Sequence, residues 1–306
     1  MKKICVGLMV GVFLFACSLK PYQLDKQKIT NEEISVENKI LDGVDIRSVE
    51  KSSFEKADIV YYAEDEIEMA QVIQYAYEKG IYKIAYQSNK TLDINLVANY
   101  LSYLNPFDLS LTQSTLDYKQ GDEVLYRSYS LNLENLDKRY SEADEIAKDI
   151  VGKIIVPRMD IDEKIKAIHD YIVKTTVYDA KNEGMNDKSA SIFSGAGVLI
   201  DKRAVCTGYS RAFMMLAKKA SIPALYVSSD IINHGWNLVY GNSGWRFIDV
   251  TWDDALPDVE NRVSDKFLNM NVEDFAREGK HAFDEEKNVK FYLRLAENFY
   301  NKNGSK

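Results

Sequence analysis

The stretch from Arg203 to Asp254 constrains the fold more than any other part of the chain. It reads RAVCTGYSRAFMMLAKKASIP and, further on, INHGWNLVYGNSGWRFIDVTWDD. Cys206, His234 and Asp249 each stand in it among small and aromatic residues. These three residue types are the parts of a nucleophile, base and orienter set, so we interpret the rest of the chain as their support, delivery or cover.

Cys206 comes directly before a helical pattern that extends to about Lys219. Apolar residues at helical spacing form the stripe that this helix buries: Ala212, Phe213, Leu216 and Ala217. A cysteine at a helix N-terminus meets the positive end of the macrodipole and unpaired backbone N–H groups, which favour the nucleophilic thiolate. The backbone N–H of Cys206 is a candidate for one half of an oxyanion hole. Gly208 leaves room for a substrate or a neighbouring strand to approach closely.

His234 and Asp249 flank a predicted β-hairpin. His234 precedes a strand over 236–240, and Asp249 is expected on a second strand over 245–250. The Gly-Asn-Ser-Gly sequence at 241–244 is a hairpin signal, so the two strands are expected to be neighbours. A carboxylate can then hold one imidazole nitrogen while the other faces the thiol. The predicted triad is therefore Cys206 as nucleophile, His234 as base and Asp249 as orienter.

These boxes make residues 140–285 resemble the transglutaminase-like superfamily. The resemblance is carried by AVCTGYS, HGWNLV and FIDVTWDD, with IKAIHDYIVKTTVYD upstream and FLNMNVEDF and His281 downstream. It implies an α+β, papain-like fold in which a helix that carries the cysteine packs on an antiparallel sheet that carries the histidine and aspartate. Gly235 stands where members usually carry alanine, and Ala196 where many relatives carry tyrosine, so the second oxyanion donor cannot be assigned from sequence.

Each site residue also has a structural interpretation. A lone cysteine on an apolar stripe is often part of the core, and a buried histidine or aspartate can be a satisfied structural group. Asp253 and Asp254 are nearby alternatives to Asp249. We expect His169 and His281 to be structural. One cysteine and three scattered histidines outside the first residues give no ligand spacing, so neither a metal nor a cofactor is implied.

The first residues predict export and a lipid anchor. Lys2 and Lys3 precede an apolar segment over 4–16, which is shorter than the roughly 20 residues that a spanning helix needs. The LFAC sequence ending at Cys17 resembles the lipobox of bacterial lipoproteins, in which the cysteine is lipidated; an ordinary secretory signal is the alternative. Cys5 lies in the signal, so Cys206 is left as a free thiol without a disulfide partner.

The predicted organisation is a signal peptide over 1–16, a lipidated Cys17 with a polar tether to 45, an α+β region over 46–136 and a catalytic domain over 137–306. Helices are expected over 64–79, 92–104, 141–155 and 162–175, strands over 57–63, 81–86, 107–118 and 124–133, and a long loop over 177–201. The formal net charge of −8 argues against a nucleic-acid partner.

The sequence therefore predicts a bacterial, extracytoplasmic, membrane-anchored cysteine enzyme that acts on amide bonds of a protein or peptide through a thioester. A water acceptor would make it a peptidase or amidase, and a lysine amine would make it a crosslinking transglutaminase. The alternatives are a catalytically silent binding module for a cell-envelope polymer or protein, and a purely structural surface lipoprotein. The sequence leaves the acceptor and the oligomeric state open.

Overall fold

The computed structural model describes residues 10–11, 36–41, 44–49, 60–88, 90–106, 109–120, 123–135, 139–184, 191–254, 263–278 and 280–301. The chain divides into two compact units. The first comprises Met1–Leu101, Leu109–Glu134 and Asn298–Lys306, and the second comprises Ser102–Asp108 and Asn135–Glu297. Most of the predicted signal peptide, Cys17 and most of the predicted tether lie outside the described residues.

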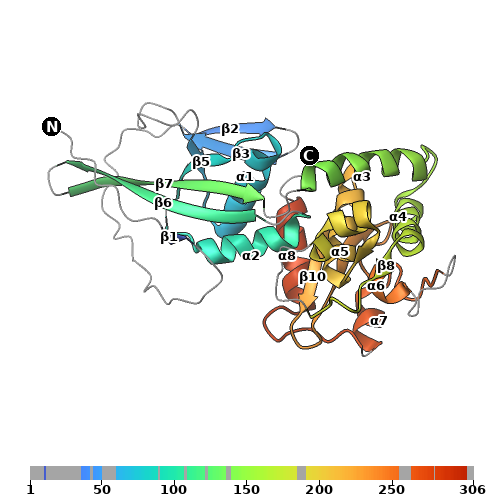
Figure 1. Ribbon diagram of the computed structural model, residues 1–306. Helices are drawn as coiled ribbons and strands as arrows, with labels where there is room; N and C mark the ends of the chain where they lie inside the picture. The colour runs from blue at the N-terminus through green and yellow to red at the C-terminus, as the bar shows by residue number, and fades with distance from the viewer. Residues whose placement is uncertain are drawn as a thin grey trace. The chain divides into compact units, whose positions relative to one another are not determined.

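The first unit contains a seven-stranded sheet in the order β1-β6-β7-β5-β4-β3-β2 (Figure 1). Its strands are β1 (Val10–Gly11), β2 (Val36–Leu41), β3 (Val44–Val49), β4 (Val60–Tyr62), β5 (Lys83–Gln87), β6 (Leu109–Gln120) and β7 (Glu123–Asn135). The strands β4 and β5 pair in parallel, and helix α1 (Glu66–Glu78) makes the crossover between them. A second helix, α2 (Ile94–Leu104), follows β5.

Local sequence signals account for the boundaries in this unit. The Asp65 side chain accepts a hydrogen bond from the backbone N–H of Glu68, which starts α1 two residues later than the apolar pattern predicts. Strand β2 lies inside the range predicted to be a tether, because its sequence, VENKIL, has three consecutive polar residues and no apolar alternation that would indicate a strand. It pairs with β3 in a register that opposes Leu41 to Val44, with Asp-Gly, a hairpin dipeptide, between them in the sequence.

The second unit packs helices against a three-stranded antiparallel sheet. The sheet has the order β10 (Ala224–Ser229), β11 (His234–Gly241) and β12 (Gly244–Ile248). The helices are α3 (Tyr140–Ile154), α4 (Ile161–Thr175), α5 (Cys206–Lys219), α6 (Val250–Asp253), α7 (Val272–Arg277) and α8 (Val289–Asn301). This arrangement confirms the predicted α+β class and the predicted antiparallel sheet beside the cysteine helix.

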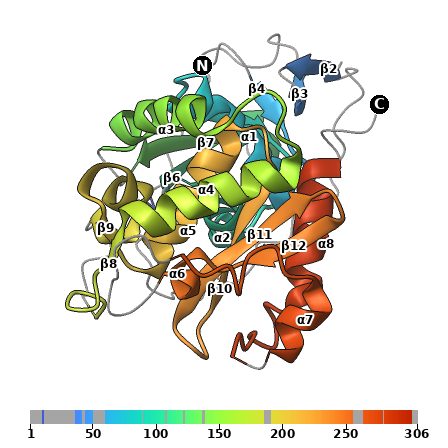
Figure 2. The same ribbon diagram turned by 90° about the vertical axis from the view of Figure 1, so that its right-hand side faces the viewer.

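Helix α5 is the centre of the second unit. It contacts α3 and α4 as well as β10 and β11, and Figure 2 shows α4 lying across it. Every residue from Gly208 to Ala217 is buried. A helix that is buried on all sides is held by its surroundings, so its first residue, Cys206, has a fixed position.

The prediction of a long loop over 177–201 was wrong in part. This segment contains the strand β8 (Val177–Tyr178), a 3₁₀ turn η2 (Ser191–Phe193) and a π-helical turn η3 (Gly197–Asp201). Strand β8 pairs in parallel with β9 (Arg203–Ala204), which follows the segment. Each element is too short to show a period in sequence. Among the residues that the structure describes, no helix has the length and apolar character needed to cross a membrane.

Candidate active site

Cys206 is the first residue of α5, as the sequence predicted. The preceding Val205 has extended backbone angles and supplies no side-chain cap, so its side chain leaves the N–H groups of the first helical turn available. The thiol is free and buried, with 8% of the residue exposed. A nearly enclosed thiol at an uncapped helix N-terminus lies at the positive end of the helix dipole.

Gly208 serves one of the two contacts expected of it, the close approach of a neighbouring strand. A side chain at this position would overlap the methyl group of Ala204 in β9 and the backbone oxygen of Ile192 in η2. The close neighbours are therefore β9 and the η2 turn. The backbone N–H of Val205 also donates to the Ile192 oxygen, so η2 and the start of α5 are fixed against each other on the side of Cys206.

His234 is the first residue of β11 and links Cys206 to Asp249. Its Nε2 lies 2.7 Å from Asp249 Oδ2. Cys206 lies near enough to contribute to the raised pKa of His234, and Nδ1 is the ring nitrogen that remains for the thiol. Its ring stacks on Trp252 with 4.7 Å between ring centroids. The preceding Asn233 adopts a left-handed conformation, with φ 46°, that asparagine tolerates and that completes the turn from β10.

Asp249 lies one residue beyond the strand on which it was expected. Strand β12 ends at Ile248, and Asp249 is instead the N-cap of α6. Its Oδ1 accepts hydrogen bonds from the backbone N–H groups of Thr251 and Trp252, both at 3.0 Å. Aspartate is a strong N-cap residue, and here the cap fixes the carboxylate so that Oδ2 points at His234.

His281, which was expected to be structural, contacts Asp249, and sequence reasoning did not predict that contact. Its Nε2 lies 2.8 Å from Asp249 Oδ2, the same oxygen that binds His234. The sequence near it resembles the segment that follows the aspartate strand in the family, but no local pattern indicated which group this histidine would contact. The described site is thus a chain of four side chains, from Cys206 through His234 and Asp249 to His281.

The charges of these four side chains stabilise one another. Burial alone would lower the pKa of His234, but the charge and hydrogen bond of Asp249, with a smaller contribution from Cys206, raise it to about 10. Burial would raise the pKa of Asp249, but His234 and then His281 hold it at about 2. Near neutral pH the geometry therefore favours an ionised Asp249 beside a protonated His234.

Two tyrosine hydroxyls lie near enough to Cys206 to be affected by its charge. Burial and then the charge of Cys206 raise the pKa of Tyr226 to about 12, and the same two causes raise the pKa of Tyr178. The Tyr226 hydroxyl lies 3.4 Å from Thr207 Oγ1. A side chain at Gly235 would overlap this hydroxyl, so the glycine that departs from the family pattern makes room for Tyr226.

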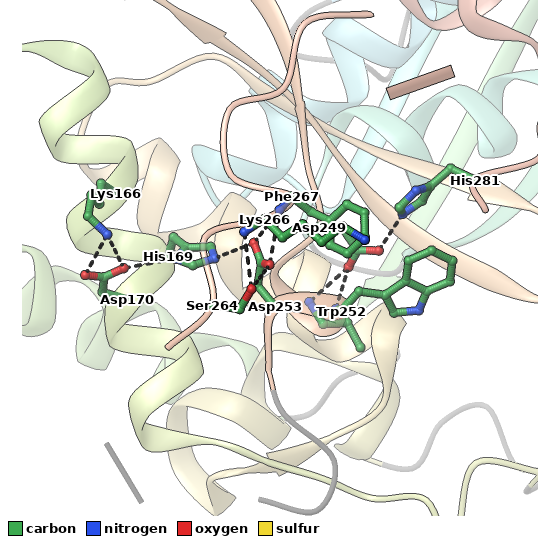
Figure 3. A network of polar contacts seen from close by, with 11 residues as sticks. Lys166, His169, Asp170, Asp249, Trp252, Asp253, Ser264, Lys266, Phe267 and His281 are labelled. Carbon is green, nitrogen blue, oxygen red and sulfur yellow. Dashed lines mark hydrogen bonds and ion pairs between the residues drawn. The ribbon is translucent and has the colours of Figure 1, made fainter. Parts of the chain in front are cut away.

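The alternative carboxylates bind elsewhere. Asp253 Oδ2 lies 3.1 Å from His169 Nε2, and Asp253 Oδ1 accepts from the Ser264 hydroxyl at 2.9 Å. Asp254 accepts from the Tyr209 hydroxyl. Figure 3 shows the two carboxylates of α6 and its cap, with Asp253 toward His169 and Asp249 toward His281. Of these three acidic residues, the structure brings Asp249 to His234.

Metal ions are also bound by residues of the types found here, His234, Asp249 and His281, although the sequence shows no spacing typical of metal ligands. Their polar atoms lie within 4.8 Å of one another. Both imidazoles, however, lie at hydrogen-bonding distance from one oxygen, at 2.7 and 2.8 Å. This geometry is that of a hydrogen-bonded network.

Comparison with known proteins agrees with this geometry. Residues 144–250 match the model of the transglutaminase-like superfamily. A segment of 156 residues, 45% of this chain, is 22% identical to the kyphoscoliosis peptidase of Mus musculus and covers 23% of it. The Homo sapiens protein of the same name is 24% identical over 169 residues, which are 48% of this chain and 24% of that protein. The match thus spans about a quarter of the length of these curated relatives.

Among solved structures, a TGase is 17% identical with a TM-score of 0.31, and the match covers 60% of this chain and 54% of that one. The periplasmic domain of TgpA from Pseudomonas aeruginosa, bound to ethylmercury, is 12% identical with a TM-score of 0.27, over 51% of this chain and 76% of that one. The family match over residues 144–250 contains Cys206, His234 and Asp249. Residues 144–250, within the second unit, therefore form a transglutaminase-like domain, whose α+β arrangement agrees with the papain-like fold.

Proposed function

We propose that this domain is a cysteine enzyme that acts on amide bonds through a thioester acyl-enzyme. The observation that carries the proposal is His234, whose Nε2 lies 2.7 Å from Asp249 and whose pKa is raised by Asp249 and, to a smaller extent, by Cys206 at the start of α5. A thiol, an imidazole and a carboxylate in this order form a nucleophile that is activated by a base and held by an orienting group.

In the proposed reaction the Cys206 proton resides on His234, and the thiolate attacks the carbonyl carbon of the amide. The tetrahedral oxyanion is stabilised by first-turn N–H groups of α5, including that of Cys206. His234 then gives its proton to the leaving amine, the C–N bond breaks, and a thioester on Cys206 remains. An acceptor, deprotonated by His234, attacks the thioester and releases the thiol. Asp249 holds His234 in the required orientation and remains ionised.

The acceptor and substrate are part of the proposal. Two relatives are named peptidases, which favours water as acceptor and a protein or peptide, including a cell-wall peptide, as substrate. A lysine amine as acceptor would give a crosslinking transferase instead. The net charge of −8 agrees with a protein or peptide partner rather than a nucleic acid.

The proposal predicts the pH dependence of Cys206 alkylation by iodoacetamide, measured on the full chain by mass spectrometry of the peptide that contains Cys206. The pKa of His234 is raised to about 10, so the imidazolium that stabilises the thiolate persists until the pH rises through that value. We expect substantial alkylation below pH 7, well under the free-thiol pKa of about 8.5. His234→Ala should remove this reactivity.

A matched control is provided by His169→Ala, which removes another buried histidine that binds an aspartate of α6. That variant should keep the alkylation profile of the wild type. A single titration near the free-thiol pKa, unaffected by His234→Ala, would contradict the enzyme proposal and favour the silent binding module.

We also propose that Cys17 is lipidated and anchors the protein at the outer face of a bacterial cell membrane. The support is the short apolar segment that ends in LFAC. Cells that express the full chain and receive an alkyne-labelled palmitate should label it, and Cys17→Ser should abolish the label and release the protein from the membrane fraction. Equal labelling of the wild type and Cys17→Ser would reject the anchor.

A further inference from the structure

The proposed reaction does not use the contact between Asp249 and a second imidazole, that of His281. Oδ2 lies 2.7 Å from His234 Nε2 and 2.8 Å from His281 Nε2. An ionised carboxylate only accepts hydrogen bonds, so both imidazoles donate to the same oxygen. Oδ1 accepts the backbone N–H groups of Thr251 and Trp252. Asp249 therefore has four donors and no exposed surface.

His281 is held in this position by an aromatic enclosure. Its ring centroid lies 3.9 Å from that of Phe275, 4.1 Å from that of Trp252 and 5.1 Å from those of Trp236 and Phe267. Trp252 is also the ring that stacks on His234. One tryptophan thus contacts both histidines that share the carboxylate, and the imidazole of His281 is fully enclosed.

We propose that His281 is a positioning residue that keeps Asp249 ionised and directed at His234, and thereby sustains the charged Cys206–His234 pair. The inference rests on the proposed function and deepens it by adding a fourth member to the site. A buried carboxylate is charged only where donors replace its lost water, and His281 is one of two side-chain donors that do so. If Asp249 becomes neutral, it no longer stabilises the imidazolium of His234.

Few charged groups among the described residues lie around Asp249 and His281. Glu278, which follows α7, has its Oε2 3.4 Å from His281 Nδ1, and its Oε1 lies 3.5 Å from Lys266 Nζ. His234 from β11 and Cys206 from α5 also lie in this site. Tyr178, from β8, also interacts electrostatically with both Cys206 and Asp249. Among these described groups, His234 and His281 are the ones whose side chains are hydrogen-bonded to Asp249.

The molecule contains an internal comparison for this role. His169 and Asp253 form a second buried pair at 3.1 Å, and Asp253 is four residues after Asp249 on the same short helix. Breaking either pair removes a buried hydrogen bond at α6. Only the His281 pair shares its carboxylate with His234, so only that pair is expected to affect the reactivity of Cys206.

The test is the acid side of the Cys206 alkylation profile in the full-length protein. His281→Phe keeps a ring in the aromatic enclosure and removes the donor, so Asp249 should take up a proton at a higher pH. The acid limb is the part of the profile where alkylation slows as the pH falls. The pH at which the rate is half-maximal on this limb should rise by about one unit, so alkylation at a given pH on the limb should be about tenfold slower. His281→Gln, whose amide nitrogen can replace Nε2 as donor, should restore the wild-type limb.

A second pair of variants guards against misfolding. His281→Asn has the same amide but is too short to reach Asp249, so comparing it with His281→Gln tests the donor without the phenyl ring. His169→Phe is the matched control, and it should lower thermal stability while leaving the acid limb in place.

Three outcomes are informative. An acid limb that shifts in His281→Phe and His281→Asn, but not in His281→Gln or His169→Phe, supports the inference. An unchanged limb in the first two variants, or an equal shift in His169→Phe, overturns it while the proposed function stands. Wild-type alkylation that does not depend on His234 overturns the proposed function, and the inference with it.

Discussion

Asp249→Asn should strongly reduce the reactivity of Cys206 while the protein remains folded; the equivalent change in a Ser-His-Asp triad lowers kcat by about 10⁴-fold. The reason is the tautomer of His234. An asparagine can keep its oxygen toward the backbone N–H groups of Thr251 and Trp252 and turn its NH₂ group toward the two imidazoles. Both hydrogens of that group then need an acceptor, so His234 and His281 must present unprotonated Nε2 atoms. His234 would carry its proton on Nδ1, the nitrogen that should receive the proton of Cys206.

The same substitution should change the pH dependence of stability. Asp249 has a pKa of about 2 in the folded protein, below the unfolded value of about 4, so its stabilisation is present above pH 4 and is lost as the pH falls toward 2. His234 has a pKa of about 10, above the unfolded value of about 6.5, so its stabilisation is complete below pH 6.5 and is lost as the pH rises through 10. The wild type should therefore exceed Asp249→Asn in stability most between about pH 4 and 6.5.

Thermal denaturation over that pH range and iodoacetamide kinetics measure the two effects. We expect the free energy of unfolding to fall by about 1–3 kcal/mol, since buried hydrogen bonds to a charged group are lost. Asp253→Asn is the control, because it removes the carboxylate that binds His169 on the same helix. It should destabilise the protein and leave Cys206 reactive; similar loss of reactivity in both variants would show that α6 as a whole, rather than Asp249, is required.

The main parts of the candidate site could be predicted from sequence because each depends on a local pattern. The helix after Cys206 follows from its apolar stripe, and the pairing of β11 with β12 follows from the Gly-Asn-Ser-Gly turn. The pairing brings His234, at the start of β11, close to Asp249, which directly follows β12. The α+β, papain-like class was implied by the family resemblance of the boxes around Cys206, His234 and Asp249, and the structure confirms that class.

The remaining features depend on contacts between residues that are distant in sequence. Asp249 was expected on a strand. Its role as the N-cap of α6 is seen only in the structure, where its side chain accepts hydrogen bonds from the backbone N–H groups of Thr251 and Trp252. His281 is 32 residues from Asp249, and no periodicity connects the two. The room that Gly235 leaves for Tyr226 requires the register between β10 and β11. Each of these features is set by tertiary packing rather than by propensity.

Cys206→Ala should abolish turnover, with an effect of about 10⁶-fold, because no other group in the described site can form the thioester. The fold should survive, since the thiol lies at the end of α5 and the buried residues Gly208 to Ala217 are unchanged. A second effect follows from the loss of the Cys206 contribution to His234, whose pKa should fall toward its ordinary value. Retained activity in Cys206→Ala would exclude the proposed mechanism.

The acyl-enzyme itself can be observed with p-nitrophenyl acetate as acyl donor, and its fate identifies the acceptor. Mass spectrometry after an acid quench should show acetyl on the Cys206 peptide of the wild type and none in Cys206→Ala. His234 must deprotonate the acceptor, so His234→Ala should slow the loss of acetyl as well as its formation. If water is the acceptor, as proposed, added cadaverine should neither speed this loss nor yield acetylcadaverine. Formation of that amide would instead make the domain an acyltransferase, with the Cys206, His234 and Asp249 mechanism unchanged and the amine in place of water.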